Sequence, residues 1–186
     1  MINDALEYIR RELRDHLGVS DGEVTIESAR VISDSDLADG ALITLVNIEE
    51  EPALRNTPHV VQTAGQPMRR EPSVFMNLYV QFSFDFQDYG TSLLNLSNTI
   101  ALFQHNRFFS AETARPANPF PAGLGRMIFE HHNMSFEALN NLWSVMGGAL
   151  YPCVIYKVRL VEIRHDVPDV SADEITTIQV DTAVRR

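Results

Sequence analysis

The 186-residue chain contains a single cysteine, Cys153, and lacks any long hydrophobic run. One cysteine allows no internal disulfide bond and excludes a metal cluster held by several thiolates. No apolar run approaches the ~20 residues that span a membrane, so we expect no direct membrane insertion. The first residues, MINDALEYIRRELRDHLG, lack the basic start and apolar stretch of a signal peptide. We therefore expect synthesis and assembly in the cytoplasm.

Basic residues are scarce. The chain has 15 Lys and Arg residues and 25 Asp and Glu residues, which gives a net charge of -10. An acidic chain repels nucleic acid and anionic membranes unless a local basic patch overrides the total. We expect no nucleic-acid partner, because the densest basic places are only pairs. These pairs are Arg10-Arg11, Arg69-Arg70 and Arg185-Arg186.

Signatures of catalysis and of cofactor binding are missing from the sequence. No glycine fingerprint follows a strand, and neither a P-loop nor GxSxG occurs. The six histidines form no HExxH, and His131 and His132, adjacent on a strand, are expected on opposite faces. Cys153 opens an apolar strand and is better explained as a small buried hydrophobe than as a nucleophile. We expect no enzyme, no cofactor and no metal site.

What the sequence does contain is an alternation of helical and strand periods. Hydrophobic residues make up 45% of the chain, enough for a packed core. Residues 3–17 have apolar positions three or four apart, with Asn3 or Asp4 as a possible cap and Gly18 as the stop. A second helix is predicted at 89–104, with Tyr89, Leu93, Leu96, Ile100 and Phe103 on its apolar stripe. Strands are predicted at 23–32, 41–50, 73–86, 126–132 and 151–165.

This order of elements predicts an α/β fold, a single mixed sheet of about five strands flanked by helices. Residues 51–72, with four prolines, and residues 105–125 are predicted to be long loops. The acidic run Glu49–Glu51 at the end of a strand is better explained as a solvated or interface feature than as a catalytic pair. We divide the chain into a domain, 1–165, and a C-terminal arm or tail, 166–186, in which ITTIQV has the alternation of an edge strand.

The stretch SFEALNNLWSVMGG, residues 135–148, predicts a short helix with both ends marked. Ser135 is a good N-cap, and Gly147 and Gly148 end the helix. Asn140 and Asn141 lie in mid-helix, where asparagine is a mediocre helix former. Either they are exposed filler or bond to a neighbouring loop, or another chain covers this face, because an amide donates and accepts without a charge.

Several stretches together resemble one known family. LNNLWSVMGGALYPCVIYKVRLVEI is the clearest, and MINDALEYIRRELRDHL, ITLVNIEEEPALRN, VFMNLYVQFSFDFQDYGTSLLNLSNTIALFQHNRFF and MIFEHHNMSFEALNNLWSVMGG agree with it in the same order. The chain is similar to the cap, or tail-terminator, family of phage-tail-like bacterial contractile injection systems. The resemblance runs from the N-terminus to about residue 164. No single motif carries it, and it supplies no catalytic residues.

The resemblance implies a structural role and a tail-terminator-like α/β fold. Such proteins form a ring, expected to be hexameric, at the baseplate-distal end of the particle, where they end growth of the inner tube and anchor the last sheath ring. The implied partners are further copies of the chain, the inner-tube protein and the sheath protein, in a particle that can be released from the cell. The alternatives are another part of the same machine, such as a sheath or baseplate adaptor, and a stand-alone enzyme. The residues we expect at interfaces are Glu50, Arg55, Asn56, Asn140, Asn141 and Trp143.

Overall fold

A computed structural model of the chain describes residues 1–28, 39–51, 60–63, 66–69, 74–145, 151–163 and 170–171. For 60–63, 66–69, 145, 160–163 and 170–171 it describes the main chain only. The described helices are α1 (Ile2–Leu17), η1 (a 3-10 turn, Asp21–Glu23), α3 (Tyr89–His105) and α4 (Phe136–Val145). The described strands are β1 (Val24–Ile26), β2 (Gly40–Glu50), β3 (Val60–Thr63), β4 (Gln66–Arg69), β5 (Val74–Asp85), β6 (Phe108–Ser110), β7 (Arg126–His131), β8 (Cys153–Ile163) and β9 (Val170–Ser171).

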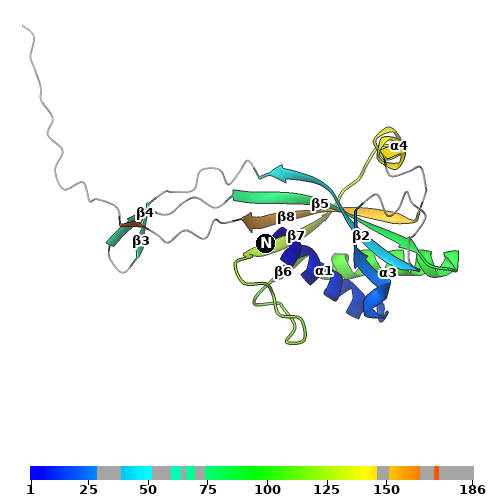
Figure 1. Ribbon diagram of the computed structural model, residues 1–186, viewed down its shortest axis with the longest axis horizontal. Helices are drawn as coiled ribbons and strands as arrows, with labels where there is room; N and C mark the ends of the chain where they lie inside the picture. Colours follow the sequence, from blue (N-terminus) through cyan, green and yellow to red (C-terminus); the bar gives the residue numbers. More distant parts are fainter. Residues whose placement is uncertain are drawn as a thin grey trace, which may run out of the picture.

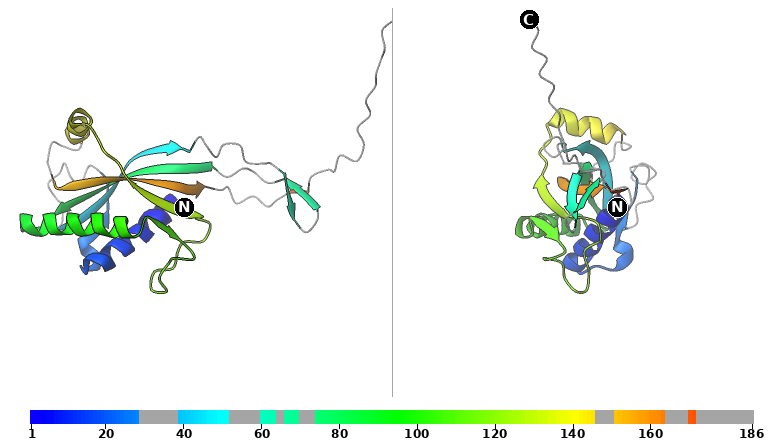
Figure 2. Two further views of the ribbon diagram at one scale, coloured as in Figure 1. Left: turned by 180° about the vertical axis from the view of Figure 1, so that it is seen from behind. Right: turned by 90° about the vertical axis from the view of Figure 1, so that its left-hand side faces the viewer.

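Six strands form the main sheet, in the order β1-β2-β5-β8-β7-β6. β1 and β2 are parallel and the other pairs are antiparallel, so the sheet is mixed. The helices α1 and α3 lie on one side of this sheet and α4 on the other (Figures 1 and 2). The predicted α/β class, with one mixed sheet flanked by helices, is therefore confirmed. The strand count differs by one, because β6 lies within the predicted loop 105–125.

The core lies between the main sheet and the helices α1 and α3. Alternate residues of the central strands, such as Leu78, Val80, Phe82 and Phe84 of β5, are fully buried there, as the period-2 pattern predicted. Phe103 of α3 stacks on Phe129 with ring centroids 4.3 Å apart. From α1 the core receives Ala5, Leu6, Tyr8, Ile9 and Leu13.

Helix α1 follows the prediction along its length but not at its start. It begins at Ile2, with Met1 in the N-cap position and no side-chain cap, so neither Asn3 nor Asp4 has that role. Asp4 lies instead in the first turn, 2.6 Å from the terminal amine of Met1, where the helix dipole favours a carboxylate. Gly18 ends the helix in a left-handed conformation, as predicted.

The predicted long loop 51–72 contains a β-hairpin, so that prediction is wrong for its central part. β3 and β4 pair antiparallel, and β9 pairs with the free side of β4, which gives a small sheet in the order β3-β4-β9. We call residues Val60–Thr63 and Gln66–Arg69 the hairpin arm. Figure 1 shows this small sheet beyond the end of the main sheet that lies away from α4. The pairing of β9 with β4 brings part of the predicted tail to the arm, whereas ITTIQV lies outside the described residues.

Candidate interaction surfaces

The face of helix α3 that packs against the sheet differs from the apolar stripe that the sequence predicted. The buried positions in its first three turns are the small polar residues Ser92, Asn95 and Thr99, while Tyr89 is 66% and Ile100 41% exposed. The buried hydroxyls have partners close by. Ser92 Oγ accepts from the main-chain amide of Phe86 at 2.9 Å, and Thr99 Oγ1 donates to the carbonyl of Asn95 at 2.8 Å. The predicted stripe is therefore wrong for Tyr89, Leu93 and Ile100, which are exposed, and right for Phe103 and in part for Leu96, which packs against the core. The exposed members give α3 an apolar outward face.

The outward face of α3 forms one wall of a hollow at the edge of the main sheet. This hollow has a volume of about 390 Å³, and its opposite wall is formed by Leu139 and Trp143 of α4. Its floor is the end of β7 and the start of β8. Its other lining residues are Tyr89, Leu93, Leu96, Ile100, His131, His132, Asn133, Met134, Tyr151, Pro152, Cys153, Val154 and Ile155.

A second hollow, of about 650 Å³, continues along the same edge. It shares Ile100 and His131 with the first and extends past Phe103 and Gln104 to Arg107. We call the two together the edge groove. Figure 2 shows α3 and α4 on opposite sides of β7 and β8, so the groove follows the edge of the sheet between two helices.

The outer side of the β7 main chain is open at His131, among the described residues that border the edge groove. In the described part of the chain, β6 pairs with Arg126–Ile128 only. The amide of Phe129 donates to the carbonyl of Arg107 at 2.8 Å, and that of His132 donates to Ile155 of β8 at 2.9 Å. Since main-chain groups alternate in direction along a strand, those of His131 point into the groove. Such an edge is a template for another strand.

Carboxylates gather at the end of the groove near Tyr151. The pKa of Asp85 is raised by burial and by the nearby charge of Asp39. The pKa of Tyr151, which lines the groove, is raised by burial and by the charge of Asp85. Asp88 caps α3 close by, accepting from the Thr91 amide at 2.9 Å. Within the described residues, none of these three carboxylates has an ion pair with Lys or Arg, so this end of the groove favours a cation.

Cys153 lines the groove as a half-buried thiol. Burial raises its pKa, and a hydrogen bond from the Trp143 indole offsets part of that rise. A raised pKa keeps the side chain neutral at pH 7, which is unfavourable for a nucleophile. Cys153 was predicted to be a small buried hydrophobe at the start of a strand. It does lie at the start of β8, but it is half-buried rather than buried.

The acidic residues 49–51 at the end of β2 do not share one partner. Glu49 accepts from the Tyr79 hydroxyl at 2.7 Å and lies 4.0 Å from the Lys157 amine. Glu51 is buried and lies 3.2 Å from Arg159. Glu50 is exposed at the surface. The run is thus not a pair of carboxylates sharing one site. Glu49 and Glu51 help to hold β5 and β8 to the end of β2 on the face opposite the core.

The asparagines of α4 are exposed, and Trp143 is half-buried. Ser135 caps the helix as predicted, its Oγ accepting from the Ala138 amide at 3.2 Å. In the described part of the chain, neither Asn140 nor Asn141 makes a side-chain hydrogen bond, and the carbonyl of Asn140 accepts from Ser144. Arg55 and Asn56 lie outside the described residues. The assignment of these residues to interfaces stays a prediction.

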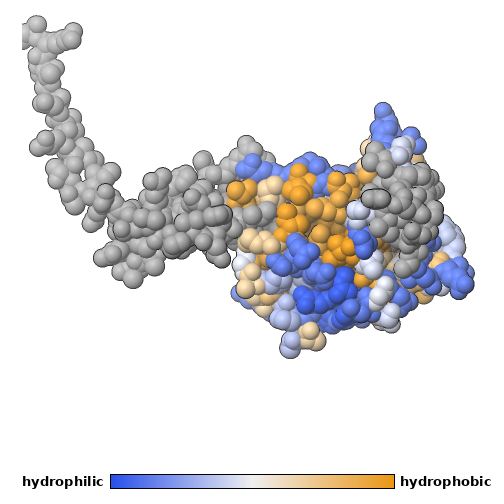
Figure 3. Space-filling model, viewed as in Figure 1, coloured by the Kyte–Doolittle hydropathy of each residue, from blue (hydrophilic) through white to orange (hydrophobic). Residues whose placement is uncertain are grey.

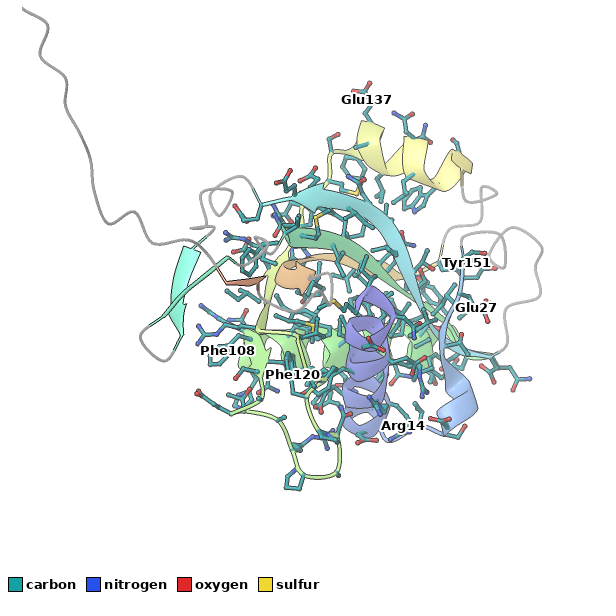
Figure 4. All side chains as sticks on the ribbon, turned by 60° about the vertical axis from the view of Figure 1, so that its left-hand side comes forward. Arg14, Glu27, Phe108, Phe120, Glu137 and Tyr151 are labelled. Atoms are coloured by element: carbon teal, nitrogen blue, oxygen red, sulfur yellow. The ribbon has the colours of Figure 1, made fainter. Side chains whose placement is uncertain are left out.

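Phe136, an apolar residue in the first turn of α4, is 91% exposed. Figure 4 shows α4 standing clear of the sheet, with Glu137 pointing outward. The hydrophobic contact of this helix is therefore made by the half-buried Leu139, Leu142 and Trp143.

A separate apolar surface lies where β2 and β5 pass the start of α1. Ile48 is 38% and Val74 44% exposed, and Met1 and Met76 are partly buried against the core nearby. In the view of Figure 3, apolar surface gathers over the main sheet above a hydrophilic band. The chain therefore carries apolar surface both here and in the edge groove, as expected of a protein with several contacts.

No group of three or more potential ligands for a metal ion occurs among the residues whose side chains the structure describes. The rings of His131 and His132 take opposite faces, as predicted: His131 contacts Tyr156 on the core side, and His132 contacts Tyr79 on the other. No described helix is long and apolar enough to cross a membrane.

The fold is that of the terminators of contractile injection systems. One similar structure is the sheath/tube terminator of the extracellular contractile injection system PVC in its extended state, with a TM-score of 0.60 and 16% identity over 99% of this chain. Another is the tube-terminating cap of the anti-feeding prophage, with a TM-score of 0.61 and 16% identity over 96% of this chain. The chain spans 64% and 60% of the lengths of these two proteins.

The chain belongs to the family described as the Pvc16 N-terminal domain, which it matches over residues 4–177. This membership confirms the resemblance drawn from the sequence. No curated protein matches the chain.

Proposed function

We propose that this protein is a structural cap of a contractile injection particle. It forms a ring at the baseplate-distal end, ends growth of the inner tube and anchors the last sheath ring. The observation that carries the proposal is a fold shared over nearly the whole chain with two terminators, together with membership of the Pvc16 N-terminal domain family. The role is structural and needs no catalytic residue.

The surfaces of the chain suit such a role. A ring of identical subunits uses two different surfaces on each, one meeting the next copy and one meeting the previous copy. A terminator also needs a surface for the tube, and the apolar area around Ile48 and Val74 is available for it. We propose that the edge groove serves the ring and that this area serves the tube.

The charge of the chain sets conditions on assembly. Six copies would carry -60 (6 × -10). Self-repulsion of this kind is screened by salt, with a Debye length of about 8 Å at physiological ionic strength. Apolar area and local pairing of unlike charges must therefore hold the ring together, and ring formation is expected to strengthen from low to physiological salt.

The test is the mass of the purified protein by light scattering, alone and with its tube protein, followed by electron microscopy of the largest species. A ring of about 126 kDa (6 × 21.0), free or on tube ends, is the expected result. A protein that decorates the baseplate end or the sheath would instead be an adaptor of the same machine. A monomer that ignores both tube and sheath would contradict the proposal.

A further inference from the structure

The edge groove is a hollow between described residues that the proposed ring assigns to a subunit contact without naming what enters it. It combines an apolar wall on α3, the open main chain of β7 around His131, and carboxylates near Tyr151. An extended segment with a free strand edge, apolar side chains and positive charge would satisfy all three features.

The hairpin arm has these properties. β3 lies at the border of the small sheet, so one side of its main chain is unpaired within the described residues. The sequence from Val60 to Arg70 is VVQTAGQPMRR, whose only charged residues are Arg69 and Arg70. Segment 60–70 therefore carries +2, and the rest of the chain carries -12 (-10 - 2). In an acidic protein this is a distinctly basic segment.

The arm and the groove lie at opposite ends of the molecule. The small sheet stands beyond one end of the main sheet, whereas α4 and the start of α3 are at the other end (Figure 1). A contact between surfaces so placed joins different copies head to tail, and a head-to-tail contact closes into a ring if the rotation between subunits divides a circle.

We propose that the hairpin arm of one copy enters the edge groove of the next, with β3 extending the main sheet at β7. The charge of +2 on segment 60–70 is complementary to the carboxylates Asp39, Asp85 and Asp88 at the end of the groove. The inference rests on the proposed ring and names the surfaces that would form it. It assigns a function to the apolar face of α3, which is exposed among the described residues.

The single cysteine makes a direct test possible, because Cys153 lines the groove. Chains carrying Val61→Cys and Cys153→Ser are mixed with tagged, unaltered chains, assembled with tube protein and treated with a short bismaleimide. We expect a covalent pair that joins one chain of each kind. Ala117→Cys in the same Cys153→Ser background, on an exposed loop, serves as the matched control and should give no pair.

Charge reversal supplies an independent readout. Arg69→Glu with Arg70→Glu should weaken subunit association about tenfold or more, since like charges would then face each other. Arg185→Glu with Arg186→Glu makes the same change in net charge and should leave association unaltered. Asp39→Arg, at an exposed position, should restore part of the loss. Thermal unfolding of each monomer checks that all variants fold.

The outcomes separate this contact from the cap itself. If rings form but the arm variants assemble normally and no mixed covalent pair appears, the hairpin contact is wrong and the cap proposal stands. If the unaltered chain forms no ring with tube protein, the ring is rejected and this contact with it.

Discussion

Asn118 and Glu12, which are 106 residues apart in the sequence, are joined by a hydrogen bond of 2.7 Å from Nδ2 to Oε1. Both side chains are buried. Arg115 donates to the same carboxylate at 3.2 and 3.3 Å and also to Asp15 at 3.0 Å. This cluster holds the loop after β6 against α1, and it explains how a charged residue is accommodated on the buried side of that helix.

The first prediction concerns this cluster. Arg115→Ala leaves the buried carboxylate of Glu12 without its cation and should lower the free energy of unfolding by about 1–3 kcal/mol. Arg107→Ala is the matched control, because Arg107 is exposed and has no ion pair within the described residues. Urea unfolding at pH 7 measures both. Equal midpoints for the two variants would show that the cluster does not stabilise the fold.

The second prediction compares two phenylalanines on helices. Phe103 is 2% exposed and stacks on Phe129, so Phe103→Ala should cost about 3–5 kcal/mol through lost burial and the cavity that remains. Phe136→Ala removes the same side chain from an exposed position and should change stability by less than about 0.5 kcal/mol. Thermal or urea unfolding of the monomers distinguishes them. A large loss for Phe136→Ala would mean that α4 packs more deeply than described.

The third prediction concerns Asn140 and Asn141. Because both are exposed, changing both to Ala should leave the unfolding midpoint of the monomer unchanged. Assembly of rings and particles should fall if another chain covers this face. Glu137→Gln, at an exposed position on the same helix, is the control and should assemble normally. Complete particles formed by the double variant would show that the two asparagines are exposed filler.

The fourth prediction is a pH dependence. A hydrogen bond from Arg14 holds the pKa of Asp15 below its ordinary value, with a further contribution from Arg115. A carboxylate with a lowered pKa in the folded state adds stability above the ordinary pKa of about 4, and this stability is lost as the pH falls through the lower, folded-state value. Stability should therefore decrease from about pH 5 to pH 3. Asp15→Asn should show a smaller decrease over that range, and an identical slope would rule out a contribution from Asp15.

Much of the fold follows from local sequence patterns. Residues 73–86 alternate with the period of two residues typical of a strand, and residues 2–17 follow the period of 3.6 residues typical of a helix. Each pattern predicts both the element and the side that it buries. Ser135 and Gly18 mark helix ends through their own main-chain and side-chain bonds. The resemblance of ordered stretches to the cap family was also available from the sequence, since it depends on residue order alone.

Other features were decided by the tertiary structure. Along the first turns of α3, Ser92, Asn95 and Thr99 are buried while Leu93 and Ile100 are exposed. Which of these residues face the sheet depends on how closely the helix approaches it. The small side chains at three- and four-residue spacing were the one signal of a close approach in the sequence. The edge groove exists because β6 pairs with only the first part of β7. The burial of Glu12 depends on Asn118 and Arg115, which come from a distant loop. Contacts between segments so far apart in the chain leave no local period, so only the folded arrangement brings them together.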